Sequence, residues 1–112
     1  MAASGWIGVD LDGTLAKYEG WKGVDHIGDP IPLMAQRVFE WLRDGIDVRI
    51  FTARVSSEDA RAEALPYIES WLTKHFGRTI PVTHVKDFAM IELWDDRCIQ
   101  VEPNTGRRMD GR

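Results

Sequence analysis

Short apolar runs that alternate with two long amphipathic segments constrain the fold of this chain more than any other feature. Apolar runs that predict strands lie at residues 6–9, 48–51, 82–85, 91–94 and 99–101. Apolar side chains recur at helical spacing over residues 33–44, and Gly45 follows as a stop signal. A second helix is expected from Ser56 or Ser57 to about Phe76, where Pro66 predicts a kink or a division.

Strands that alternate with helices are typical of an α/β domain with a mostly parallel sheet. We expect a Rossmann-like three-layer domain with five strands in the order 5-4-1-2-3. Right-handed crossovers from the first strand to the third would place both helices on one face. Only the short segment from Lys86 to Met90 then returns the chain to strand four, so the second face is expected to be thinly covered. A partner subunit over Phe51 and Trp94, or helix stems and loops of the same subunit, could cover it.

The length, charge and cysteine content limit the class of protein. The 112 residues suit one domain, predicted over 1–103, with a flexible tail over 104–112. A net charge of -4, with lysines and arginines scattered along the chain, argues against general nucleic-acid binding. The chain has one cysteine, and no leader peptide or membrane-length apolar stretch is evident. We therefore expect a cytoplasmic protein without a membrane association, which can form a homo-oligomer.

Residues suited to phosphate chemistry follow three of the apolar runs. Asp10 ends the first run, Thr52 the second, and Asp95 and Asp96 the fourth. Parallel α/β sheets bind ligands at the carboxyl ends of their strands, so these side chains are expected to converge. Carboxylates gathered in this way repel one another unless a cation is present. Because no cysteine or histidine accompanies them, a hard ion such as Mg²⁺ is expected ahead of Zn²⁺.

The segment around Asp10 has a more specific pattern. Asp10 and Asp12 are two residues apart and lean to the same side, and Gly13 lets the backbone turn sharply beside a ligand. A chance surface turn could have this sequence without any chemistry. The apolar run before it and the matching residues after it favour a site.

The motifs Asp10-Leu-Asp-Gly-Thr-Leu15, Thr52, Lys86 and Asp95-Asp96, in this order, resemble those of the haloacid dehalogenase superfamily of phosphohydrolases. The resemblance spans residues 6–96. It implies that Asp10 is the nucleophile and Asp12 the acid–base. It also implies that Thr52 and Lys86 contact the phosphate. The other implied phosphate contacts are Asp10, Asp12 and Gly13 of the first motif and Ala53, the residue after Thr52. Neither of the cap insertions found in larger members is present, so a capless domain is expected.

The resemblance further implies that Mg²⁺ is held by Asp10, the backbone carbonyl of Asp12, Asp95, and Asp96 directly or through water. Two features depart from the family pattern. The acidic pair is followed directly by Arg97, without the longer spacing of acids, and Lys86 lies unusually near the pair. Lys74 is the alternative to Lys86.

The expected function is therefore a Mg²⁺-dependent phosphomonoesterase that forms an aspartyl phosphate. Its substrate would be a phosphorylated small molecule or the phosphate end of a macromolecule. The alternative is a phospho-acceptor or phosphate-binding regulatory module without turnover. Receiver modules, however, place the acidic pair after the first strand and the acceptor after the third, the reverse of the order here.

Several other residues allow more than one interpretation. Arg54 could bind phosphate or cap a helix. Trp21 could stack on a substrate or anchor the irregular segment 16–31 by packing. His26, His75, His84 and Cys98 have no spacing typical of metal ligation or nucleophilic catalysis and are expected to be ordinary residues.

Overall fold

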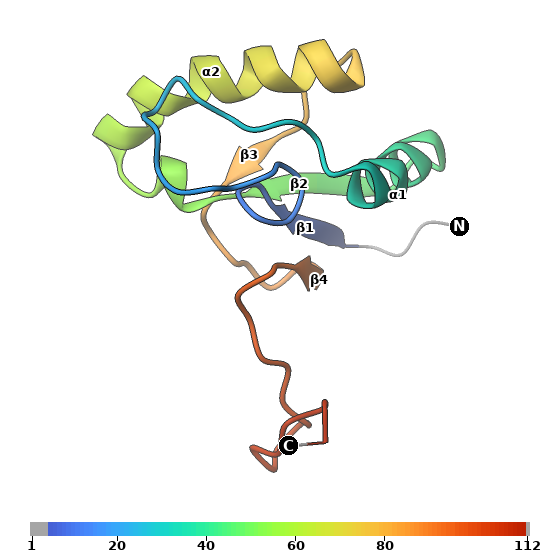
Figure 1. Cartoon of the computed structure of the whole chain (residues 1–112). Helices are drawn as coiled ribbons and strands as arrows, with labels where there is room; N and C mark the ends of the chain where they lie inside the picture. The colour runs from blue at the N-terminus through green and yellow to red at the C-terminus, as the bar shows by residue number, and fades with distance from the viewer. Residues whose placement is uncertain (1–4, 112) are drawn as a thin grey trace.

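The computed structural model describes residues 5–111 and forms one small α/β unit (Figure 1). Residues 1–4 and Arg112, at the ends of the predicted domain and tail, lie outside the described residues. The elements in chain order are β1 (Trp6–Asp10), α1 (Pro32–Arg43), β2 (Asp47–Phe51), the 3₁₀ turn η1 (Ala53–Val55), α2 (Glu58–Phe76), β3 (Val82–Thr83) and β4 (Met90–Trp94). In this part of the chain, no helix is long and apolar enough to cross a membrane.

The sheet has four parallel strands in the order β3-β2-β1-β4. Side chains alternate between its faces, as strand geometry requires. Ile7 and Val9 of β1 lie opposite Val48 and Ile50 of β2, and all four are buried in the main core. A parallel α/β sheet was therefore predicted correctly from the alternating apolar runs.

Both helices pack on the same face of the sheet. Their buried residues, among them Val38 of α1 and Leu72 of α2, belong to one core cluster with Ile7 and Val9. The helices also meet each other, because the rings of Phe39 and Phe76 lie 4.7 Å apart. No helix covers the other face in residues 5–111, so the predicted three-layer arrangement is wrong and the domain has two layers.

The predicted fifth strand is also absent. Residues 99–101 do not join the sheet; Val101 forms an isolated antiparallel bridge with Arg108. This C-terminal segment extends away from the sheet beyond β4, drawn in red in Figure 1. Ile99 and Val101 are more than half exposed, so the burial that would hold a strand in the sheet is missing. The predicted order 5-4-1-2-3 is accordingly wrong in its fifth strand, and the four strands present follow the remaining order 4-1-2-3.

The connection from β3 to β4 runs over the second face. Residues 84–89 link the end of β3 to Met90, which pairs with Trp6 at the start of β1. Asp87 of this connection accepts a hydrogen bond of 2.8 Å from the indole N–H of Trp6, and Arg49 lies over the indole ring. Trp6 is thereby fully buried although no helix covers it. The thin cover that the sequence predicted is this extended segment.

Trp94 does not lie on the face where a partner was expected. It packs edge to face against Trp41 of α1, with the ring centroids 5.2 Å apart, and contacts the main core. The reason is the register of β4, in which Trp94 pairs with Val9, a residue of the helix-covered face. Placing Trp94 beside Phe51 on an open face was therefore wrong.

The helix ends follow the local signals. The hydroxyl of Ser57 accepts a hydrogen bond from the backbone N–H of Ala60 at the start of α2. Gly45 has a positive φ of 75° directly after the end of α1. Pro66 lies inside α2 without dividing it, because α2 continues unbroken to Phe76.

Residues 17–30, called the flap below, form an irregular loop whose two ends are tied together. The N–H of Lys17 donates to the carbonyl of Asp29, and Ala16 forms an isolated bridge with Pro30. The indole N–H of Trp71 on α2 donates to the carbonyl of Gly28 at 2.9 Å. The flap is therefore fixed both to itself and to α2.

Candidate active site

A cavity of about 740 Å³ lies at the carboxyl ends of the central strands. Asp10 at the end of β1, Thr52 after β2, and Asp95 and Asp96 after β4 all line it. The flap contributes further lining, including Trp21. The parallel sheet thus brings together four side chains that are far apart in the sequence, as expected for this edge.

The three acids form a compact cluster. Asp10, Asp95 and Asp96 each offer a carboxylate oxygen, and these oxygens lie within 4.8 Å of one another. None of the three forms an ion pair with any residue in the described range 5–111. The cluster therefore concentrates negative charge without a side chain that neutralises it.

The hydroxyl of Thr14 links two members of this cluster. It lies 3.1 Å from Asp10 Oδ2 and 3.1 Å from Asp96 Oδ1, and it accepts a hydrogen bond from the backbone N–H of Asp96. Since a hydroxyl has one proton, it donates to one carboxylate at a time. Thr14 thus fixes the end of β4 against the turn that follows β1.

The pKa of Asp10 is raised from its ordinary value of 3.8 to about 7. Burial is the largest cause, followed by the negative charge of Asp95 and a hydrogen bond with Asp96, while the hydrogen bond with Thr14 acts in the opposite direction. A cation at the cluster would favour the ionised form of Asp10. The raised pKa therefore reflects first the burial of Asp10 and then the uncompensated acids beside it.

Gly13 is required by the position of Asp96. Its φ is 89°, a conformation that side chains other than glycine rarely adopt. A Cβ atom at this position would lie 2.5 Å from Asp96 Oδ2. The sharp turn expected at Gly13 is present, and it leaves room for a carboxylate of the cluster.

Asp12 is not a member of this cluster and pairs with Arg54. The guanidinium donates two hydrogen bonds, from Nε to Asp12 Oδ2 at 2.7 Å and from Nη2 to Asp12 Oδ1 at 2.8 Å. This two-point contact fixes the plane of the carboxylate. The Arg54 side chain is only 6% exposed, so the pair is largely shielded from water.

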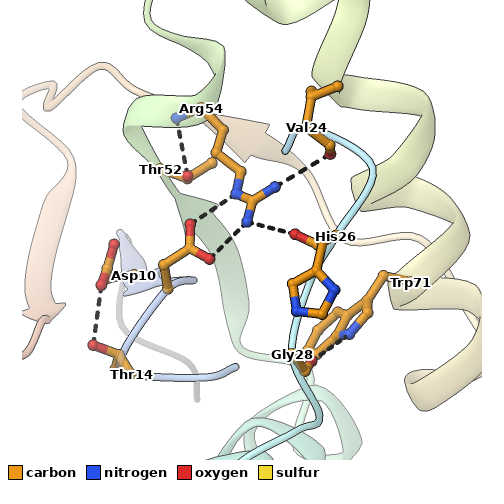
Figure 2. A network of polar contacts seen from close by, with 9 residues as sticks. Asp10, Thr14, Val24, His26, Gly28, Thr52, Arg54 and Trp71 are labelled. Atoms are coloured by element: carbon orange, nitrogen blue, oxygen red, sulfur yellow. Dashed lines mark hydrogen bonds and ion pairs between the residues drawn. The ribbon is translucent and has the colours of Figure 1, made fainter. Parts of the chain in front are cut away.

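Arg54 also joins Asp12 to the flap, and Figure 2 shows the contacts of Arg54 with Val24 and His26. It donates to the backbone carbonyls of Val24 and His26, at 3.3 and 2.9 Å. Its guanidinium carbon lies 4.8 Å from the centre of the Trp21 ring. Arg54 therefore acts neither as a simple helix cap nor as an unpaired phosphate ligand; it is the polar centre of a network between β1, η1 and the flap.

Thr52 is the buried polar residue of the site. It is 3% exposed, its backbone N–H donates to Thr83, and its hydroxyl accepts from the N–H of Arg54. The hydroxyl proton remains available to a ligand, because that contact uses the oxygen as acceptor. Ala53, the next residue, lines the same cavity.

The two lysines considered from the sequence do not reach the cavity. Lys86 is exposed on the segment over the second face and makes no hydrogen bond or ion pair with a described residue. Lys74 lies near the end of α2 and does not line the cavity either. The basic residues that do line it are Arg54 and Arg97.

Sequence reasoning missed the roles of Thr14 and Arg97 and left that of Arg54 open. Thr14 belongs to the recognised motif, so its proximity to Asp10 could have been noticed. The partner of Arg54 could not, because Asp12 is 42 residues away and no local pattern links the two. Arg97 follows the acidic pair directly, and only the turn after β4 decides that it lines the cavity.

Comparisons with known proteins add evidence on the fold alone. No family model matches the chain, and no curated protein matches it. Among solved structures, it is similar to the conserved protein coded by locus from Bacteroides thetaiotaomicron, with a TM-score of 0.59 and 18% identity. The match covers 91% of this chain and 84% of the other. The similarity supports the small α/β, Rossmann-like architecture.

Proposed function

We propose that this protein is a Mg²⁺-dependent phosphomonoesterase in which Asp10 is the nucleophile. One observation carries the proposal: Asp10, Asp95 and Asp96 converge at the strand edge that also presents Thr52. Phosphate monoesters hydrolyse so slowly unaided that a positioned nucleophile and charge stabilisation must act together. The resemblance of the motifs to the haloacid dehalogenase superfamily supports the same assignment.

The donor set fits a magnesium ion. Three carboxylates and no nitrogen or sulfur ligand suit a hard cation that retains water molecules. In the proposal, Asp10, Asp95 and Asp96 hold the ion together with the backbone carbonyl of Asp12. When bound, the ion neutralises charge on the carboxylates and on the phosphoryl oxygens.

In the first half-reaction, a carboxylate oxygen of Asp10 attacks phosphorus and the bond from phosphorus to the leaving oxygen breaks. Asp12 gives a proton to that leaving oxygen. In the second, water attacks phosphorus, Asp12 takes its proton, and Asp10 is regenerated with release of phosphate. The Thr52 hydroxyl donates a hydrogen bond to the phosphoryl group. Gly13 and Ala53 lie next to the same group. Arg97, which has no ion-pair partner in residues 5–111, supplies positive charge.

Lys86 keeps its role as a phosphate contact only if the segment 84–89 moves, because it does not line the cavity. Replacing Lys86 by Ala would decide this point. A loss of turnover comparable to that of Thr52→Ala would support the predicted contact. Unchanged turnover would leave Arg97 as the basic residue of the site.

A second candidate is a phospho-acceptor module that forms the aspartyl phosphate without turnover. It is favoured by the contact in which both oxygens of Asp12 accept from Arg54, since an acid–base must release one of them to carry a proton. Stopped-flow release of the leaving group distinguishes the two. The phosphatase gives continuous release, whereas the acceptor gives one equivalent and then stops.

The main test is hydrolysis of an aryl phosphate with Mg²⁺. We expect activity that is abolished by chelator and by Asp10→Asn. Asp44→Asn is the matched control, because Asp44 lies at the end of α1, outside the cavity. Full activity of Asp10→Asn would contradict the mechanism.

A further inference from the structure

Trp21 is an exposed aromatic residue that the proposed chemistry does not use. It lines the large cavity from the flap and is 59% exposed. Tyr18 of the flap and Phe51 at the end of β2 line the same cavity. A tryptophan that served only to anchor the flap would be expected to bury most of its ring, because burial of the apolar ring is what would stabilise the flap. Trp21 instead leaves much of its surface facing solvent or a ligand.

The Trp21 ring is nevertheless held in place. Its contact with Arg54 is 4.8 Å from guanidinium carbon to ring centre. Arg54 is itself fixed by Asp12 and by the carbonyls of Val24 and His26. A ring that is ordered before binding loses little further conformational freedom when a ligand stacks on it. Trp21 is therefore a preorganised platform at the cavity.

The charge of the cavity makes such a platform useful. Its acidic lining residues are Asp10, Asp12, Glu63, Asp95 and Asp96, and its basic ones are Arg54 and Arg97. Arg54 is occupied by Asp12. The protein thus offers little positive charge to bind the part of a substrate beyond its phosphate, and affinity for that part must come from apolar and aromatic contacts.

We infer that the substrate is a nucleotide-sized phosphomonoester whose leaving group has a planar aromatic ring, which stacks on Trp21. This inference rests on the proposed function. A cavity of about 740 Å³ falls in the range that accommodates ligands of this size. Stacking is tolerant of ring identity, so the inference concerns the class of substrate.

The test compares two probes, adenosine 5′-monophosphate and glycerol 1-phosphate, which share the phosphate and differ in the ring. We expect Trp21→Leu to raise KM for the adenosine probe about 10-fold and to leave KM for glycerol phosphate unchanged. Trp21→Phe, which keeps a ring, should recover most of the loss. Phe88→Leu is the control, because Phe88 is fully exposed and lies outside the cavity.

Two results of this kinetic test would overturn the inference. The first is a Trp21→Leu variant whose KM is unchanged for both probes, and the second is one whose KM is raised equally for both, which would make Trp21 only a flap anchor. If the wild type hydrolyses neither these probes nor an aryl phosphate, the proposed function fails, and calorimetric binding of the same probes then decides the inference separately. Tighter binding of the adenosine probe that Trp21→Leu removes would support it. Equal binding of both probes would refute it.

Discussion

At the scale of single residues, the site depends on two arrangements that share the turn after β1. Asp10 belongs to the acidic cluster with Asp95 and Asp96, while Asp12 belongs to the network of Arg54. The two carboxylates are two residues apart and yet have opposite surroundings. One is close to other acids, and the other is paired with a cation. This difference suits them to different roles.

Arg54 is expected to act through Asp12. Arg54→Ala removes the two-point contact with Asp12 and the hydrogen bonds from Arg54 to the flap, so we predict that kcat falls about 100-fold, as misplacement of a reacting group can cause. Arg54→Lys keeps the charge but cannot form the fork, and should recover only part of the loss. Steady-state kinetics of both variants, compared with Arg43→Ala on the exposed end of α1, tests this. Wild-type kcat in Arg54→Ala would contradict it.

The pKa of Asp10 predicts how metal-free stability depends on pH. The pKa of Asp10 is about 7 in the folded protein, above its ordinary value of 3.8. The protonated form of Asp10 therefore stabilises the fold, and this contribution is fully present below pH 4. That contribution is lost as the pH rises through about 7. Chemical denaturation between pH 4 and 8 should show the loss in the wild type and not in Asp10→Asn. Mg²⁺ added at pH 8 should stabilise the wild type more than the variant.

Gly13 provides a separate test of the cluster. Gly13→Ala and Gly45→Ala both force alanine into a positive φ, at a cost of about 1–2 kcal/mol each. Only Gly13→Ala also meets a neighbour, Asp96, whereas nothing lies within 4 Å of a Cβ at Gly45. We expect both variants to lose stability in denaturant, and only Gly13→Ala to lose phosphatase activity. Activity lost equally in both would contradict this interpretation.

At the scale of elements, the extended segment 84–89 takes the place of a covering helix. Its Asp87 is the acceptor for the buried indole of Trp6. The pKa of Asp87 is lowered, first by this hydrogen bond, so the stability that it contributes is lost only as the pH falls below its ordinary value of 3.8.

Asp87→Ala should lower the free energy of unfolding, because the buried indole N–H of Trp6 loses its hydrogen-bond acceptor. Asp87→Asn retains an oxygen acceptor and should cost less. Urea denaturation of the two variants at neutral pH measures the difference. Identical losses for the two variants would show that the hydrogen bond to Trp6 is not what holds the segment.

The elements also show which parts of the fold local sequence determines. Ser57 and Gly45 mark helix ends through contacts within a few residues, and these were predicted. Ile99 and Val101 satisfy the pattern of a strand but remain exposed, because the pattern does not specify whether a neighbouring strand edge will receive them. In the site, the convergence of Asp10, Thr52 and Asp95 follows from parallel strands, whereas the partner of Arg54 depends on how the flap closes.

At the scale of the whole molecule, the two-layer domain and the flap together form the cavity at the carboxyl ends of the strands. Both helices support the sheet from one face, and the flap is tied to α2 through Trp71 and to the site through Arg54. The edge where the acids meet is therefore held from several directions. A homo-oligomer stays a prediction, and sedimentation at high micromolar concentration would test it.

The proposed mechanism requires that Asp10 becomes covalently phosphorylated. Its most direct test is to quench the reaction with an aryl phosphate and Mg²⁺, trap any acyl phosphate with hydroxylamine, and locate the modified residue by tandem mass spectrometry. We predict a hydroxamate at Asp10, formed only when substrate and Mg²⁺ are both present. Hydrolysis without any trapped carboxylate, or modification at Asp95 or Asp96 in place of Asp10, would contradict the mechanism.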